Sequence, residues 1–172
     1  MDAGCEIDGP HCSVQMAVYI PERAQDLALL CFGTPNKNWI TFRINKNGSL
    51  QAEIVDDSGM AHTCTSTTMF GGLLDISRLG LLHIGIQFNF SRRSRLEIIL
   101  DGEVVCRLER PLKVTRPVPL IQRLGSDFEY GGNAKGMQVA ELAIWNSLLS
   151  RADLRQTSQY FKSLKDGPVV EF

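Results

Sequence analysis

Apolar and polar residues alternate along many short segments of the chain, as they do in strands that bury one face. The segment Leu82–Phe90 is the clearest case, since an apolar residue stands at every second position. Leu27–Phe32 is instead a continuous apolar run, which suits a strand covered on both faces. The polar, β-branched segment His62–Met69 is typical of an edge or surface strand. The other predicted strands are Ser13–Ile20, Ile40–Ile44, Leu50–Ile54, Leu96–Leu100, Glu103–Leu108, Leu120–Leu124 and Met137–Trp145.

Two hairpin turns are predicted between these strands. Asp101-Gly102 is a tight-turn signal. In the other hairpin, a two-residue Asn47-Gly48 turn would set Ile44 opposite Gln51 and mix the two faces. A three-residue loop that includes Lys46 sets apolar residues opposite one another, and Gly48 then supplies the left-handed conformation. The pairs expected from this loop are Ile44–Leu50, Phe42–Ala52, Ile40–Ile54, Thr41–Glu53 and Arg43–Gln51.

One amphipathic helix is expected near the end of the chain. Ser150 is a good N-cap and Asp153 follows three residues later, so the two can form a capping box. Leu149 and Leu154 are spaced as a hydrophobic staple, and Gly167-Pro168 ends the helix. The apolar face of the helix consists of Leu154, Phe161 and Leu164. The residues expected to face solvent are Arg151, Arg155, Gln159 and Lys162. About ten strands and this helix predict an all-β fold: a two-sheet antiparallel sandwich with one short C-terminal helix.

Two stretches carry a resemblance to a known family. The matching residues are Leu81–Phe88, Ile98–Gly102, Leu124-Gly125-Ser126, Gly136, Glu141, Ile144-Trp145-Asn146 and Leu149-Ser150. In these positions the chain resembles laminin-G-like domains, which belong to the concanavalin A-like jelly-roll group, although Leu81 replaces the family's Trp. The resemblance implies a jelly-roll sandwich. It implies no substrate, because lectins, glycosidases and adhesion modules share that fold.

The bulk properties fit one ordinary globular domain. The chain has 172 residues, 44% hydrophobic and 22% charged, with a formal net charge of −1. A net charge this small creates no overall electrostatic field that would attract nucleic acid. No apolar run is long enough for membrane insertion. The start of the chain has no signal-peptide pattern, so an intracellular location follows if the termini are native. We expect an N-terminal arm at 1–12, the sandwich at 13–166 and a C-terminal tail at 167–172.

Five cysteines stand at spacings that indicate neither a disulfide scaffold nor a zinc site. Cys31 and Cys106 lie in apolar runs and are expected to be small buried hydrophobic residues. Cys5 and Cys12 can close a small N-terminal loop in an oxidising compartment.

Motifs for catalysis are weak. The one Glu-x-Asp, Glu6-Ile7-Asp8, lacks the second Glu that glycosidases of this fold carry, and Pro10 breaks any strand there. Glu141 is expected to be a surface or structural residue, and His83 a structural or surface histidine inside a strand. No nucleophile elbow is present, and Gly131-Gly132 and Gly136 follow no strand-to-helix turn. The sequence therefore predicts no catalytic residue and no enzyme.

Three kinds of surface feature leave alternatives open. No cofactor is expected, and calcium is the alternative, with Asp56, Asp57, Asp127 and Asn133 as oxygen ligands. Asn47-Gly48-Ser49 and Asn89-Phe90-Ser91 match the glycosylation sequon. A basic patch is expected either to contact an anionic partner or to be a solvated sheet face; it comprises Arg92, Arg93, Arg95, Arg107, Arg110, Lys113, Arg116 and Arg123, opposed by Glu97, Asp101, Glu103 and Glu109.

These observations favour a non-catalytic binding module that contacts protein partners, as a structural subunit of a larger assembly. A lectin-like carbohydrate-binding domain is the alternative, and a glycoside hydrolase comes third. A lectin should show an aromatic platform on a concave face or calcium-dependent sugar binding. The candidates for the platform are Trp39, Tyr130 and Trp145, with Trp145 expected to pack under the helix. Nucleic acid is not an expected partner, because no aromatic residues interleave with the basic residues between Arg92 and Arg123.

Overall fold

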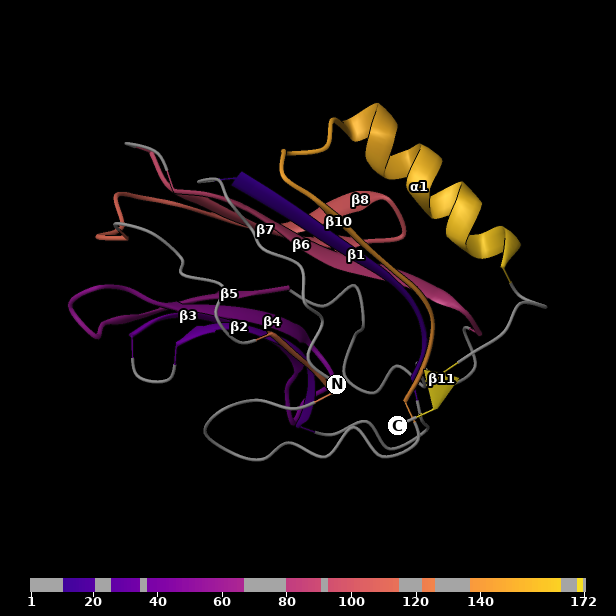
Figure 1. The fold of residues 1–172 in the computed structure, drawn as a ribbon, viewed down its shortest axis with the longest axis horizontal. Coiled ribbons are helices and arrows are strands. Elements are labelled where there is room, and N and C mark those ends of the chain that lie inside the picture. The colour runs from indigo at the N-terminus through magenta and orange to yellow at the C-terminus, as the bar shows by residue number, and fades with distance from the viewer. Residues whose placement is uncertain are drawn as a thin grey trace.

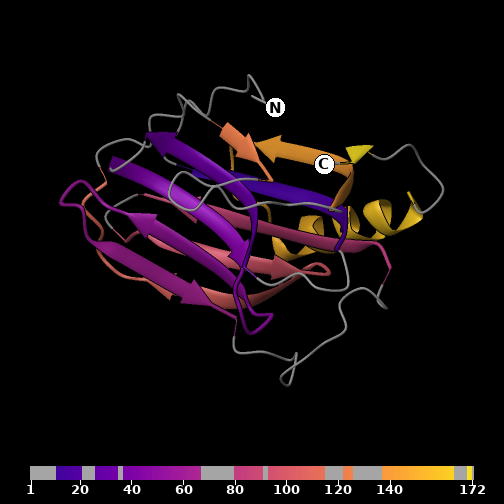
Figure 2. The ribbon, with the colours of Figure 1, turned by 90° about the horizontal axis from the view of Figure 1, so that it is seen from below.

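The computed structural model describes residues 11–20, 26–34, 37–66, 80–90, 93–114, 122–125, 137–164 and 170–171. Two antiparallel sheets lie face to face, and one helix covers the outer face of the larger sheet (Figure 1). Figure 2 shows the two sheets from below, with the helix on the far side of the six-stranded sheet from the five-stranded one. The predicted all-β sandwich with a single C-terminal helix is confirmed.

The larger sheet has six described strands, and two of its neighbouring strands, β1 and β10, come from opposite ends of the chain. Its order is β11 (Val170–Glu171), β10 (Gln138–Trp145), β1 (His11–Tyr19), β6 (Leu82–Asn89), β7 (Arg95–Leu100) and β8 (Glu103–Glu109). The turn between β7 and β8 has positive φ at both Asp101 (51°) and Gly102 (84°), as a type I′ hairpin requires. The predicted tight turn is confirmed.

The smaller sheet has five strands, in the order β5 (Ala61–Thr65), β4 (Leu50–Val55), β3 (Lys37–Ile44), β2 (Leu27–Thr34) and β9 (Gln122–Leu124). All five pairs predicted for the β3–β4 hairpin are observed, from Ile44–Leu50 to Ile40–Ile54. Gly48 has φ of 84° and its amide donates to the Asn45 carbonyl, so the longer loop is correct. The edge position expected for the His62 segment is confirmed at β5.

The core lies between the sheets and is built from alternate residues of each strand. Val14, Met16 and Val18 of β1 face it, opposite residues such as Phe42 and Ile54 of the smaller sheet. Phe32 and Phe88 meet edge to face across the sandwich, with ring centroids 6.4 Å apart. Each of these side chains is buried, which stabilises the fold by roughly 1.5–3 kcal/mol per large apolar residue.

The helix α1 (Arg151–Ser163) forms where its start signals predict. The Ser150 hydroxyl accepts from the Asp153 amide and the Asp153 carboxylate accepts from the Ser150 amide, which completes the capping box. Leu154 and Phe161 are buried against the outer face of the larger sheet. The helix ends at Ser163, with Leu164 as C-cap, before the expected Gly167-Pro168 stop.

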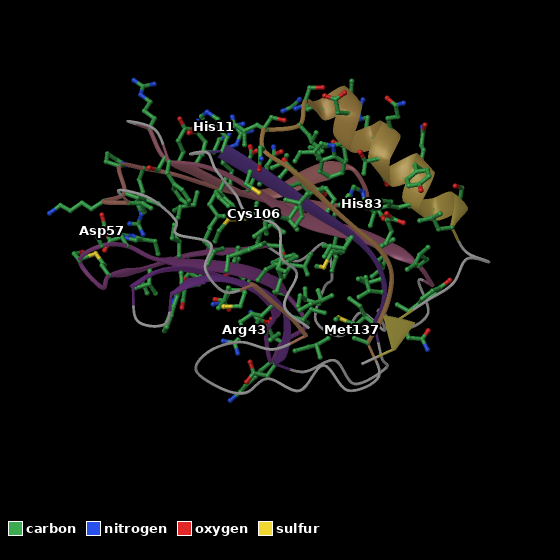
Figure 3. The ribbon with its side chains drawn as sticks, viewed as in Figure 1. His11, Arg43, Asp57, His83, Cys106 and Met137 are labelled. Atoms are coloured by element: carbon green, nitrogen blue, oxygen red, sulfur yellow. A yellow bond between two sulfur atoms is a disulfide. The ribbon has the colours of Figure 1, made fainter. Side chains whose placement is uncertain are left out.

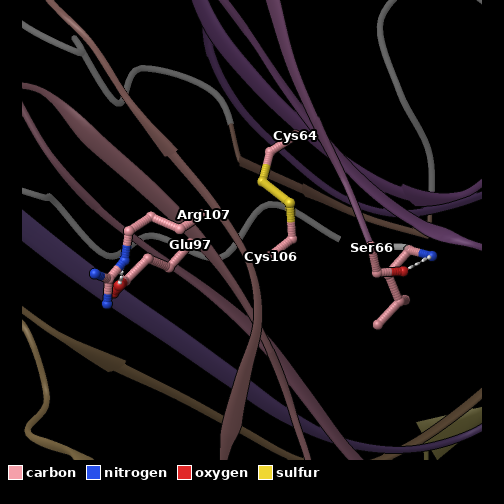
Figure 4. Close-up of a disulfide and its surroundings, with 6 residues drawn as sticks. Cys64, Ser66, Glu97, Cys106 and Arg107 are labelled. Carbon is pink, nitrogen blue, oxygen red and sulfur yellow. Dashed lines mark hydrogen bonds and ion pairs between the residues drawn. A yellow bond between two sulfur atoms is a disulfide. The ribbon is translucent and has the colours of Figure 1, made fainter. Parts of the chain in front are cut away.

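A disulfide joins the two sheets at one edge of the sandwich. Cys64 on β5 and Cys106 on β8 are bonded, with their Cα atoms 6.4 Å apart (Figure 4). The prediction that Cys106 is a plain buried hydrophobic residue is therefore wrong, because β5 and β8 are sheet edges that lie over each other. Cys31 is buried as expected. Cys5 lies outside the described residues, so its pairing with Cys12 stays a prediction.

Both ends of the described chain enter the larger sheet. His11, expected in the N-terminal arm, is the first residue of β1. Val170–Glu171, within the expected C-terminal tail, pairs with Gln138 and Val139 of β10. Backbone pairing thus draws parts of both expected flanking segments into the sandwich. Among the residues that the structure describes, no helix is long and apolar enough to cross a membrane.

Candidate functional site

The outer face of the larger sheet carries a chain of hydrogen-bonded polar side chains, buried except at Arg107, which we call the outer-face network: Ser13, Gln87, Glu97 and Arg107. The Ser13 hydroxyl donates to Gln87 Oε1 (2.7 Å), and Gln87 Nε2 donates to Glu97 Oε2 (2.6 Å). Arg107 Nε donates to Glu97 Oε1 (2.6 Å; Figure 4). Glu97 is 1% exposed, so its negative charge needs this guanidinium partner.

The outer-face network also holds the segment that leads into the helix. The Leu149 amide donates to Gln87 Oε1 (3.2 Å) and to Ser13 Oγ (3.3 Å). Leu149 immediately precedes the N-cap Ser150, so these two bonds place the first turn of α1 over the sheet. Phe161, two turns later, packs on the same face against Ala17 and Leu81.

Between β10 and α1 lies an open groove of about 330 Å³, which we call the helix groove. Strand β10 contributes Glu141, Ala143 and Trp145, at alternate positions and therefore on one face. Its remaining lining residues are Leu149 from the connection and Asp153, Gln156, Thr157, Tyr160 and Phe161 from the helix. These helix residues recur at spacings of three and four, so they follow one side of α1.

Two aromatic side chains give the helix groove its apolar surface. Trp145 is half-buried on the strand side, and Tyr160 on the helix side is 54% exposed. Phe161 is buried and lines the base of the groove, with its ring tilted 49° to that of Tyr160 at 5.7 Å. An aromatic platform with polar groups around it is typical of sites for amphipathic ligands.

The polar lining includes two carboxylates. Asp153 Oδ2 accepts from both the amide and the hydroxyl of Ser150, and these hydrogen bonds lower the pKa of Asp153 below its ordinary value. A carboxyl with a lowered pKa is unsuited to act as a general acid near neutral pH. Glu141, expected as a surface or structural residue, lies half-buried in the helix groove. Gln156 and Thr157 add neutral hydrogen-bonding groups.

His83 lies directly beneath this site. Its ring meets Phe161 edge to face at 5.2 Å, and its Nε2 lies 2.8 Å from Gln15 Oε1. Burial lowers the pKa of His83 to about 4, a shift that Asp101 opposes and Lys162 adds to. The imidazole is therefore neutral at pH 7. The structure shows a buried histidine with a structural partner, one of the two expected roles.

Gly85 makes the contact of His83 with Gln15 possible. Gln15 is paired with Gly85 across β1 and β6. A Cβ atom at Gly85 would overlap the Gln15 side chain and the Val14 carbonyl. The missing side chain at Gly85 thus gives the Gln15 amide its path across the sheet to His83.

Of the four proposed calcium ligands, Asp127 and Asn133 lie outside the described residues. Asp56 Oδ1 accepts from the amides of Ser58 (2.9 Å) and Met60 (3.1 Å), and Oδ2 lies 3.0 Å from His62 Nε2. Burial alone would raise the pKa of Asp56, but a hydrogen bond from the Ser58 hydroxyl, together with these, outweighs it and holds the pKa below its ordinary value. The described residues contain no group of three His, Cys, Asp or Glu side chains that could hold a metal.

The structure separates the residues of the expected basic patch. Arg95 and Arg107 both reach Glu97, at 3.5 Å and 2.6 Å. Arg93, Arg110 and Lys113 are exposed and lie outside strands β7 and β8. Arg92, Arg116 and the Arg123 side chain are not among the described parts of the chain.

The expected aromatic platform is also divided. Trp39 is 4% exposed, Tyr130 is outside the described residues, and Trp145 lines the helix groove. Tyr160 is a groove residue that the sequence pattern missed. The signal was its position next to Phe161 on the predicted helix, at the border between the apolar and wet faces. The segments with Glu6-Ile7-Asp8, Gly131-Gly132 and Gly136 lie outside the described residues.

No family model and no curated protein matches this sequence. Solved structures do resemble its fold. The binding domain of botulinum neurotoxin serotype D/C matches with a TM-score of 0.60 at 11% identity, over 88% of this chain and 36% of that one. A botulinum neurotoxin type C structure, from work on cell entry through interaction with two ganglioside molecules, matches at 0.57 and 9%, over 88% and 36%.

The heptameric SAP-like pentraxin of Limulus polyphemus matches with a TM-score of 0.60 at 10% identity, over 87% of this chain and 70% of that one. This chain therefore spans about a third of the length of the toxin binding domains and most of the pentraxin. At such identities the similarity shows the fold alone: a two-sheet β-sandwich of the jelly-roll kind.

Proposed function

We propose that this chain is a non-catalytic binding module whose ligand is a glycan held in the helix groove. The observation that carries the proposal is the pairing of Trp145 and Tyr160 with Glu141, Gln156 and Thr157 in one open groove. The C–H faces of a sugar ring pack on aromatic side chains, while its hydroxyl groups exchange hydrogen bonds with carboxylates and amides. Both kinds of group are present on facing walls.

The comparison structures support this choice over protein contacts, because one of the similar neurotoxins is described with gangliosides, which are glycolipids. Gangliosides carry acidic as well as neutral sugar units, and the acidic lining of the helix groove favours the neutral ones, since Glu141 and Asp153 would repel an anionic unit. The laminin-G-like relationship remains part of this proposal, and the Glu141-to-Ser150 stretch that carries the resemblance contributes much of the groove.

Intrinsic fluorescence offers a direct test, because the chain has two tryptophans and one is buried in the core. In a Trp39→Phe background, Trp145 becomes the sole reporter. Neutral glycans that bind are expected to shift its emission and to protect it from acrylamide quenching. Tyr160→Ala should weaken that binding by about two- to tenfold, the usual worth of one aromatic contact.

The matched control is Met60→Ala, which removes the other large apolar side chain that is exposed among the described residues and lies in the β4–β5 turn. It should leave affinity unchanged. A full glycan array with no binder, with and without calcium, would refute the glycan proposal. Release of sugar from a bound ligand, abolished by Glu141→Gln, would instead make the groove a hydrolase site.

Protein contacts, with this chain as a subunit of an assembly, are our second proposal. A specific observation favours them: Trp145 and Tyr160 line the helix groove, Tyr160 is 54% exposed, and aromatic side chains of this kind are enriched in protein interfaces. Native fractionation tests this: migration far above 19.1 kDa supports it, and migration as a monomer refutes it.

A further inference from the structure

A second pocket lies on the opposite side of the sandwich, beside the β3–β4 hairpin. It is open, has a volume of about 420 Å³ and is lined by Asp26, Arg43, Asn45, Lys46, Asn47 and Gln51. We call it the hairpin pocket. Figure 3 shows Arg43 on the smaller sheet, far from His83 and the helix. Every lining side chain is polar, and none of them takes part in the helix groove.

The two asparagines of the hairpin pocket present donors rather than acceptors. Asn45 Oδ1 accepts from the amides of Asn47 (3.2 Å) and Ser49 (3.0 Å), which uses both of its lone pairs. Asn47 Oδ1 accepts from the Ser49 amide (3.0 Å). The turn geometry thus engages the carbonyl ends of both side chains. Their NH₂ ends point away from these bonds and remain as the groups to offer a ligand.

The charges of the hairpin pocket add to this donor character. Arg43 and Lys46 supply two positive charges, and Asp26 supplies the one negative charge. Asp26 Oδ1 lies 3.0 Å from a terminal nitrogen of Arg43, whose side chain is 16% exposed. The side chain of Asp26 is 40% exposed, and the backbone of Asp26 has a positive φ of 59°. Arg43 lies opposite the small Ala28 across β2 and β3, which leaves room for its guanidinium along the sheet.

We propose that the hairpin pocket binds the carboxylate of an acidic sugar, with Asp26 occupying part of that position in the unbound protein. Guanidinium groups bind planar carboxylates well, and this one already holds a carboxylate at the pocket mouth. Lys46 adds charge from the hairpin tip, and the amide NH₂ groups of Asn45, Asn47 and Gln51 match sugar hydroxyl and carbonyl oxygens. The ligand carboxylate competes with Asp26 for the positive charge.

This site is separate from the proposed function of the helix groove, and either can fail without the other. The test uses ¹⁵N-labelled full-length chain and follows the backbone amides of residues 45–48 and the side-chain NH₂ signals. The probe is the methyl glycoside of N-acetylneuraminic acid. Methyl galactoside serves as the neutral sugar and sodium acetate as the plain carboxylate.

The expected result is saturable shifts confined to the hairpin pocket for the acidic sugar, weakened by added salt. Lys46→Gln should weaken binding by roughly three- to fivefold, whereas the exposed Lys113→Gln should leave it unchanged. Asp26→Asn should tighten binding by about threefold, because it removes the competing charge while Asn tolerates the positive φ.

Several outcomes would overturn the proposal. They are an absence of shifts with millimolar acidic sugar, equal affinity for acetate or for the neutral sugar, and weaker binding by Asp26→Asn. Shifts at Tyr160 and Trp145 with the neutral sugar, but none at the hairpin, would leave the helix groove as a site and remove this one.

Discussion

Removing the Cys64–Cys106 disulfide tests how the two sheets are held together. The bond joins β5 and β8, which are edge strands of different sheets and 42 residues apart in sequence. In the chain-entropy description, closing a loop of that length in the unfolded state stabilises the folded state by about 4 kcal/mol at 25 °C. For a domain of this size, that loss lowers Tm by roughly 8–16 °C.

The perturbation is the double variant Cys64→Ala/Cys106→Ala, measured by urea unfolding beside the oxidised and the reduced wild-type chain. Reduction should lower the wild-type midpoint and should leave the double variant unchanged. A thiol count in denaturant checks the premise. Five cysteines less the two in this bond leave three reactive thiols, and a further Cys5–Cys12 bond would leave one.

The outcome that would refute this reasoning is a double variant with the wild-type midpoint. The two edges would then be held by packing alone, and the bond would add no constraint to the unfolded chain. A count of five thiols in chain purified under oxidising conditions would show that the bond does not form at all.

Three further predictions follow from the outer face of the larger sheet. Gly102→Ala should lower the unfolding free energy by about 1–3 kcal/mol in urea, because φ is 84° and a Cβ would lie 3.1 Å from the helix backbone. The folded pKa of His83 is about 4, below its ordinary value of 6.5, so its contribution to the unfolding free energy is complete above pH 6.5. Between pH 6.5 and 4 only the unfolded chain takes up a proton, and the unfolding free energy should fall by about 3 kcal/mol. His83→Gln should flatten this dependence on pH. Ser13→Ala should cost about 1–2 kcal/mol and speed hydrogen exchange of the Leu149 amide, and unchanged exchange would contradict the role of the outer-face network.

The sequence predicted the structure correctly where the geometry of a segment depends only on residues within that segment. The β3–β4 hairpin has the predicted register because a shift by one residue would turn Ile44 and its alternate neighbours away from the core. The helix begins at the predicted residue because Ser150 and Asp153 satisfy each other's backbone groups. Neither result depends on where the rest of the chain lies.

Features that join distant segments were not predictable in the same way. Cys64 and Cys106 meet because two sheet edges are superposed, and nothing in the spacing of the cysteines indicates which edges those are. Tyr160 faces the groove because α1 lies at a particular angle on the sheet, although helical periodicity alone places it near the wet face. The Asp26–Arg43 pair joins the residue before β2 to the neighbouring strand β3, a contact that depends on the register of that pairing.

The helix groove combines both kinds of information. Its two walls, β10 and α1, are consecutive in sequence, and the strand, the cap and the helix are each readable locally. The angle between the two walls cannot be predicted locally. It depends on hydrogen bonds from the Leu149 amide to Ser13, 136 residues earlier, and to Gln87, 62 residues earlier. Gly102 on the other side of the helix permits close contact with the helix backbone. The width of the groove, and hence the ligand that fits it, is therefore set by residues that do not line it.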